Sequence, residues 1–297
     1  MASFTAIFFN VDPQVQNICW SYWESTSGRK PEIVTFCERS WKSNGGFGDI
    51  KLLTPLTLPD YLGERDLPSQ FRNMPPVKKA NAIRLALLSK YGGYWLDAGV
   101  AVSAGVENWV LQKCSEEGFF AFQGVGNDRL LATWFLASAR KNPFVAEWSR
   151  LYNKFFSRRR IHEAHSQTKS PSRLATHVLA RLNGTWLRSS PTRTALWAKP
   201  PLRWLPFYPY FIMHYIANKI LEEPRFGRDF ASVHFEPAGA PLRLRQVFSL
   251  ARSPSREAIE AAVSAVPIHK LNTYRDYDEE TLRTLYDVFS LDSRGYL

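Results

Sequence analysis

Asp97 is the residue of this sequence whose type and position best suit chemistry on a ligand. It directly follows the aromatic and apolar residues 94–96, which predict a short buried strand. The next two residues, Ala98 and Gly99, are too small to cover its carboxylate. Open α/β sheets bind ligands beyond the carboxyl ends of their strands, so an acid in this position is well placed to hold a metal–phosphate group.

The segment before Asp97 predicts the elements that must position it. Residues 79–90 carry apolar side chains at helical spacing, with no helix breaker among them. Gly92 and Gly93 follow, and glycine adopts the left-handed backbone that a helix C-terminus often needs. We therefore expect a helix, a glycine turn and a strand, with Asp97 at the far end of the strand.

Other residue types that could do chemistry give weaker patterns. His162, His165, His177 and His234 lack the mutual spacing of metal ligands, and the apolar segment around His214 favours a hydrogen-bonded core histidine. The chain has no Walker loop, G-x-G-x-x-G, G-x-S-x-G or C-x-x-C motif. These absences argue against kinases, dehydrogenases, hydrolases and zinc modules.

The composition is that of a cytoplasmic α/β protein. The 297 residues, 45% of them hydrophobic, suffice for one large domain or two small ones and can fill a sizeable core. No apolar run approaches the roughly 18 residues of a membrane span, and the N-terminus lacks the features of a signal peptide. Cys19, Cys37 and Cys114 are odd in number and far apart, which indicates reduced thiols and no disulfide or zinc framework.

The net charge of +11 comes almost wholly from one segment. Residues 151–205 contain eleven Lys or Arg residues against one acid, Glu163. A surface of this kind suits an anionic membrane, a lipid-linked phosphate or a nucleic acid. A merely solvated face explains it equally well, so the sequence leaves both interpretations open.

The remaining pattern alternates strands with helices and shows no linker, which predicts one α/β domain over residues 1–297 with a basic helical subregion at 151–222. The aromatic cluster around Trp20 is either a stacking surface for a nucleotide base or part of the core. The elements we expect are strands at 4–10, 32–36, 50–53, 119–123 and 130–137, helices at 38–43, 143–157, 172–182, 210–221, 257–263 and 278–289, a loop at 237–243 and an extended segment at 266–271.

Five short motifs occur in order along the chain. The longest, at residues 83–98, reads IRLALLSKYGGYWLDA. The others are CWSYW at 19–23, WFLAS with a following NP at 134–143, YFIMHY at 210–215 and IHKL at 268–271. Together they resemble the capsular polysaccharide synthesis glycosyltransferases, a family related to the transferases with a DXD sugar-binding motif.

The resemblance implies a GT-A fold, in which a Rossmann-like mixed sheet is flanked by helices. It also implies transfer of a sugar from a UDP- or GDP-sugar donor to a polysaccharide, glycolipid or other glycan acceptor. A divalent metal, Mn²⁺ or Mg²⁺, would bridge the protein and the donor diphosphate. Such a metal would neutralise the charge that grows on the leaving nucleoside diphosphate.

The motifs also imply site residues. Asp97 would bind the metal and the donor, and His269 would complete the metal site, since a neutral imidazole is a reasonable Mn²⁺ ligand. Arg84 would join Asp97 in catalysis and reach the donor sugar or phosphate. The other donor-binding residues would be Trp20 near the base, Asn81 at the sugar, Gly92, Gly93 and Trp95, and Lys270 beside the diphosphate.

The sequence departs from the family pattern at points that bear on mechanism. A full DXD motif would carry a second acid at Gly99, so we expect weaker metal affinity. Many relatives have an acid at Asn81, where the amide keeps the hydrogen bonds and loses the charge. No general base is evident, and an inverting enzyme needs one to deprotonate the acceptor hydroxyl. We therefore expect a retaining reaction.

Two hypotheses for the whole protein follow. The first is a cytoplasmic glycosyltransferase that contacts the anionic inner face of the membrane, acts on glycan or lipid-linked glycan acceptors and does not use nucleic acid. The alternative is a degenerate protein without activity, in which Asp97 is a turn acid and His269 a satisfied loop histidine. That protein would bind anionic lipid or nucleic acid through its basic surface.

Overall fold

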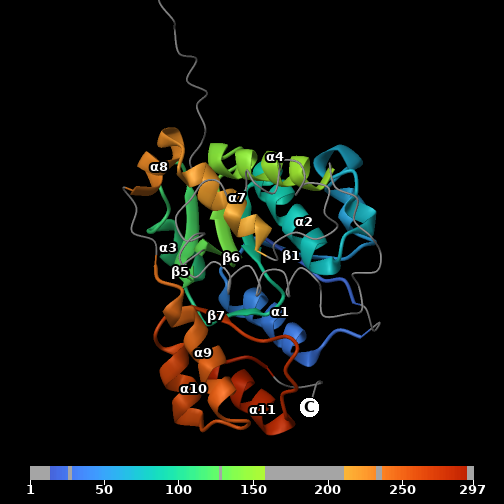
Figure 1. The fold of residues 1–297 in the computed structure, drawn as a ribbon. Helices are drawn as coiled ribbons and strands as arrows, with labels where there is room; N and C mark the ends of the chain where they lie inside the picture. Colours follow the sequence, from blue (N-terminus) through green and yellow to red (C-terminus); the bar gives the residue numbers. More distant parts are fainter. Residues whose placement is uncertain (1–13, 26–28, 127–128, 158–210, 232–235, 293–297) are drawn as a thin grey trace, which may run out of the picture.

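A computed structural model describes residues 14–25, 29–126, 129–157, 211–231 and 236–292 (Figure 1). Its centre is a five-stranded mixed sheet in the order β2-β1-β3-β6-β5. The first three strands in this order run parallel, and β6 is antiparallel to both β3 and β5. The strands are β1 (Ile18–Tyr22), β2 (Asp49–Leu53), β3 (Gly93–Leu96), β5 (Phe119–Gly126) and β6 (Arg129–Ser138).

Helices cover both faces of this sheet, which confirms the fold class expected from the sequence. One face packs against α2, α4 and α7, and α1 lies on the opposite side (Figure 1). These helices are α1 (Glu32–Asn44), α2 (Pro76–Tyr91), α4 (Pro143–Ser157) and α7 (Ile212–Leu221). The bounds of α4 are those predicted, because its aromatic and aliphatic residues recur at helical spacing and end up buried.

A second, two-stranded sheet joins distant parts of the chain. β4 (Val100–Val102), just after β3, pairs antiparallel with β7 (Ile268–Lys270), with Ala101 opposite His269. The C-terminal helices gather around β7 (Figure 1). They are α9 (Gly239–Leu250), α10 (Arg256–Val263) and α11 (Glu279–Val288). Two further short helices are α3 (Val106–Leu111) and α8 (Pro224–Ala231).

The turn between α2 and β3 is built on its two glycines. Gly92 and Gly93 have φ values of 71° and 96°, a backbone that side chains disfavour. A β-carbon on Gly93 would lie 2.4 Å from the carbonyl oxygen of Ile18, so β1 approaches this turn closely. The indole of Trp20, on β1, donates a hydrogen bond of 2.9 Å to the carbonyl of Gly92. The chain thus enters β3 in a fixed direction.

Two of the predicted elements are wrong. Residues 32–36, expected as a strand, form the first turns of α1, in which Ile33, Cys37 and Trp41 recur every four residues and are buried. The short β-branched run was a local signal that helix packing overrode. Residues 237–243, expected as a loop, contain the start of α9, whose Pro241 lies in the first turn, where a missing N–H costs nothing.

Other expectations meet the structure only in part. The strand expected at 4–10, the helix expected at 172–182 and most of the basic segment lie outside the described residues. No helix among the described ranges is long and apolar enough to cross a membrane. Cys19 and Cys37 are buried and Cys114 is partly buried, and all three are free thiols.

Candidate functional site

Asp97 lies directly after the carboxyl end of β3, as predicted. Its backbone is fixed on both sides, because its N–H donates to the carbonyl of Trp134 at 2.8 Å and its carbonyl accepts from the N–H of Val100 at 2.8 Å. The second of these bonds closes a tight turn into β4. The side chain remains 30% exposed, so a ligand at this edge of the sheet can reach the carboxylate.

The two carboxylate oxygens of Asp97 face different partners. Oδ1 accepts from Arg84 Nη2 at 2.5 Å and from the indole Nε1 of Trp95 at 2.9 Å. Oδ2 accepts from Lys270 Nζ at 3.4 Å. Asp97 is therefore one acid between two cations. The side chains that donate hydrogen bonds to it come from α2, β3 and β7.

Arg84 is the fixed member of this cluster. Its side chain is only 4% exposed, and its guanidinium carbon lies 4.9 Å from the ring centroid of Trp95. Nη1 donates to Asn81 Oδ1 at 3.2 Å and contacts the sulfur of Met213, on α7, at 3.4 Å. These contacts orient the guanidinium toward Asp97, and they bring Asn81 into the cluster.

The environment keeps Asp97 ionised. Burial alone would raise its pKa, but the charges of Arg84 and Lys270, with the hydrogen bonds from Trp95 and Lys270, together outweigh burial and hold the pKa below its ordinary value. The carboxylate is consequently a poor proton acceptor and a good hydrogen-bond acceptor for hydroxyl groups. Burial lowers the pKa of Arg84, against the opposing charge of Asp97.

Lys270 reaches Asp97 because the segment after β7 packs closely on Gly99. The N–H of Leu271 donates to the carbonyl of Gly99 at 2.7 Å. A β-carbon at residue 99 would lie 2.6 Å from Thr273 Cγ2 and 3.5 Å from Lys270 Nζ. The glycine at this position therefore allows the lysine and its loop to approach the end of β3.

Comparison with known proteins agrees with the sequence motifs. A family model described as capsular polysaccharide synthesis protein matches residues 8–166, which is more than half of the 297 residues. The chain belongs to the capsular polysaccharide synthesis family. The matched stretch contains Arg84, Trp95 and Asp97, and it ends before Lys270.

The similarity to a solved structure is weak. The solved structure of PaToxG Glycosyltransferase is 10% identical, with a TM-score of 0.38 over 93% of this chain and 86% of that chain. No curated protein matches this member of the capsular polysaccharide synthesis family.

His269 lies away from Asp97, although it adjoins Lys270 in sequence. Successive residues of a strand face opposite sides, so these two side chains diverge. The imidazole is fully buried, with Nε2 3.5 Å from Ser103 Oγ and its ring 5.4 Å from that of Phe289. Burial lowers the pKa of His269 to about 3. The structure does not bring this histidine to the acid with which it was expected to share a metal.

The described residues around Asp97 are not suited to hold a divalent metal. Among them, no group of three or more His, Cys, Asp or Glu side chains lies close enough together to hold one. Mg²⁺ and Mn²⁺ prefer carboxylate and other oxygen ligands. Here the single carboxylate already faces Arg84 on one oxygen and Lys270 on the other.

Three other predicted residues lie at the opposite end of β3. Gly92 follows the last residue of α2 and Gly93 is the first residue of β3, and Trp20 is 1% exposed with its indole bonded to the Gly92 carbonyl. Trp20 packs against Tyr61 and Tyr91, with ring centroids 5.3 and 5.5 Å away. The structure thus brings together Asn81, Arg84, Trp95, Asp97 and Lys270, and places these three residues in the supporting core.

Met213 is the residue at the site that sequence reasoning missed. Its sulfur contacts Arg84, and its carbonyl accepts from the indole of Trp148 at 2.9 Å. It belongs to the YFIMHY motif at residues 210–215, which was noted for the resemblance alone. Next to it, His214 Nε2 lies 3.4 Å from Thr133 Oγ1. That motif was the available signal that α7 closes one side of the Arg84 cluster.

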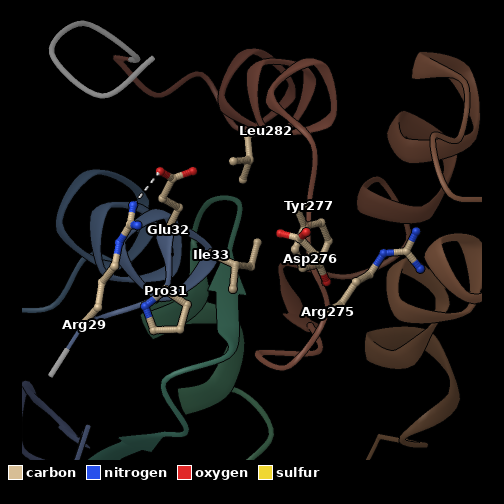
Figure 2. Close-up of a pocket in the computed structure, with 8 residues that line it drawn as sticks. All are labelled: Arg29, Pro31, Glu32, Ile33, Arg275, Asp276, Tyr277 and Leu282. Carbon is tan, nitrogen blue, oxygen red and sulfur yellow. Dashed lines mark ion pairs between the residues drawn. The ribbon is translucent and has the colours of Figure 1, made fainter. Parts of the chain in front are cut away.

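A separate pocket of about 240 Å³ lies between the start of α1 and the loop before α11 (Figure 2). Its basic side chains are already bonded. Arg29 forms an ion pair of 3.7 Å with Glu32. Arg275 donates to three backbone carbonyls at the end of α9, and Figure 2 shows it directed away from Glu32. The pocket is therefore less suited to a phosphate than the edge of the sheet at Asp97.

Proposed function

We propose that this protein is a glycosyltransferase that binds a UDP- or GDP-sugar at Asp97 and transfers the sugar to a glycan acceptor. The observation that carries the proposal is the Asp97 carboxylate, fixed by Arg84 and Trp95 yet partly exposed at the carboxyl end of β3. Ligands of open α/β sheets bind at this position. In this proposal the acceptor is a growing polysaccharide or a lipid-linked glycan, and the family match supports a glycan acceptor in general.

Each residue of the cluster has a role in this proposal. Asp97 accepts a hydrogen bond from a hydroxyl group of the donor sugar through Oδ2, the oxygen that Arg84 leaves open. Arg84 keeps the carboxylate ionised and in place. Lys270 provides positive charge for the donor diphosphate, whose negative charge grows as it leaves. Asn81 holds Arg84 through its amide oxygen.

The transfer proceeds with retention in this proposal. The bond between the anomeric carbon and the phosphate oxygen breaks, and the nucleoside diphosphate leaves with the bonding electrons. The acceptor hydroxyl forms the new bond on the same face and gives its proton to the departing phosphate. The depressed pKa of Asp97 supports this assignment, because an inverting reaction needs a carboxylate or imidazole able to take the proton. Proton NMR of the anomeric position in the product tests it.

A thermal-unfolding panel tests the function itself. UDP, GDP, CDP and ADP are compared, and the best of them is followed by a hydrolysis assay with its nucleotide sugars. A ligand at 100 times its Kd adds about 2.7 kcal/mol to the free energy of unfolding, so the right nucleotide raises Tm measurably. Asp97→Asn should lose this shift and the hydrolysis.

Asp66→Asn is the matched control for that panel. Asp66 also forms a lysine ion pair, at 2.9 Å with Lys90, but away from the cluster. This variant should bind nucleotide like the wild type. The proposal fails if no nucleoside diphosphate shifts Tm, or if Asp97→Asn and Asp66→Asn behave alike.

A further inference from the structure

We propose that the ammonium group of Lys270 takes the place of a divalent metal, so that the diphosphate of the donor binds without a metal ion. This inference rests on the glycosyltransferase function proposed above. The positive charge that contacts the diphosphate would then be the lysine ammonium, where the sequence motifs imply a metal ion.

The first argument is the charge of the cluster. Arg84 and Lys270 carry two positive charges against the single negative charge of Asp97. The described cluster therefore already has an excess positive charge, which attracts an anion. A divalent cation placed at Asp97 would stand beside both basic groups with one carboxylate to hold it, and the repulsion is strong where water is partly excluded.

The second argument is the position of Lys270 relative to residue 99. Its Nζ lies 3.5 Å from the point where a β-carbon of residue 99 would be, and 3.4 Å from Asp97 Oδ2. An acid at residue 99 would begin in the space that this ammonium borders. Thr273 and the lysine therefore fill the space that the second acid of a DXD motif would need, and Gly99 allows them to lie there.

The third argument is what Lys270 offers a phosphate. Its side chain is 16% exposed, and its position is set by the pairing of β7 with β4. An ammonium has three N–H donors, and Asp97 accepts from one of them at the long distance of 3.4 Å. Lysine binds phosphate as a point charge. Arg84 is far less accessible and is committed to Asp97, so Lys270 is the cation that meets the ligand.

Isothermal titration tests this directly. UDP and GDP are titrated into the full chain in EDTA, in MgCl2 and in MnCl2. We expect the same affinity in all three solutions. Lys270→Gln should weaken binding in EDTA by about ten-fold or more, since hydrogen bonds to charged groups are worth more than neutral ones. Lys270→Arg, which keeps the charge, should restore most of the affinity.

The control is Lys90→Gln, which removes a lysine that is also paired with a carboxylate, Asp66. It should bind like the wild type, and thermal unfolding of every variant reports whether it is folded. Binding that appears only with Mg²⁺ or Mn²⁺ overturns the inference and leaves the glycosyltransferase proposal standing. Metal-free binding that Lys270→Gln does not weaken also overturns it. No binding in any solution overturns both.

Discussion

Trp20 and Gly92 are joined by a hydrogen bond of 2.9 Å between the indole N–H and the backbone carbonyl, across 72 residues of chain. This bond ties β1 to the turn that starts β3, and β3 ends at Asp97. The bond thus lies at the opposite end of this strand from the carboxylate. A substitution at that end can therefore change stability without touching the ligand site.

Replacement of Trp20 by phenylalanine should lower stability and leave nucleotide binding unchanged. The substitution removes the only donor that Trp20 directs at the Gly92 carbonyl, and an unsatisfied buried acceptor costs about 1–3 kcal/mol. Urea denaturation measures the loss, and titration with UDP or GDP measures the affinity. Normal stability with weakened nucleotide binding would instead place Trp20 against the base, as the motif resemblance implies.

Gly93→Ala should lower the free energy of unfolding by more than about 1 kcal/mol. Losses of this size are expected when alanine replaces glycine at a backbone conformation that alanine disfavours. The reason is twofold, since φ is 96° and the new β-carbon would lie 2.4 Å from the carbonyl of Ile18. Gly63→Ala is the matched control, because nothing lies within 4 Å of a β-carbon there. Equal denaturation midpoints for the two variants would contradict this account of the turn.

Asp97→Ala should destabilise the fold as well as remove ligand binding. It leaves the nearly inaccessible Arg84 without its anionic partner, and breaking a buried pair in this way costs about 3–5 kcal/mol. Arg84→Met combined with Asp97→Ala should recover part of that loss, because the uncompensated charge is gone. A double-mutant cycle by urea denaturation measures the coupling, and additive effects would show that the pair is not coupled.

The buried His269 should make the free energy of unfolding decrease as the solution becomes more acidic. Burial lowers its pKa in the folded state to about 3, against about 6.5 in an unfolded chain. The unfolded state thus binds the proton first. The stabilisation is complete above roughly pH 6.5 and is lost as pH falls toward 3, at about 1.4 kcal/mol per pH unit.

The substitution that checks this is His269→Gln, which has no titrating group. Its free energy of unfolding should fall less steeply than that of the wild type between about pH 6.5 and 5, a window in which the histidine contributes about 2 kcal/mol of the change. The comparison uses slopes, so a constant loss of stability in the variant does not affect it. Parallel slopes would mean that His269 has the same pKa in the folded and unfolded states.

The central part of the site was predictable because its signals are local. Helical spacing, two glycines and an apolar strand together placed Asp97 at the end of β3, and the structure agrees. The strand predicted at residues 32–36 was wrong because a short run of β-branched and aromatic residues fits a strand and a buried helix equally well. Only its packing under β4, through the Trp41 indole and the Val100 carbonyl at 2.6 Å, decides between them.

The remaining part of the site depends on strand pairing, which local patterns do not encode. The IHKL motif pointed to both His269 and Lys270. Which of the two faces Asp97 is decided by the register of β7 on β4, and a shift of one residue would exchange them. The pairing of Ala101 with His269 turns the lysine to the acid and the histidine into the core.

The pairing of β4 with β7 also sets when the site appears during synthesis. Lys270 follows Asp97 by 173 residues, so at 5–20 residues per second the lysine leaves the ribosome roughly 10–30 s later. Until then a nascent chain holds Arg84 and Asp97 as a balanced pair with no surplus charge. If Lys270 binds the diphosphate, an unfinished protein chain has no affinity for the donor. Nucleotide binding then identifies protein molecules in which β7 has paired with β4.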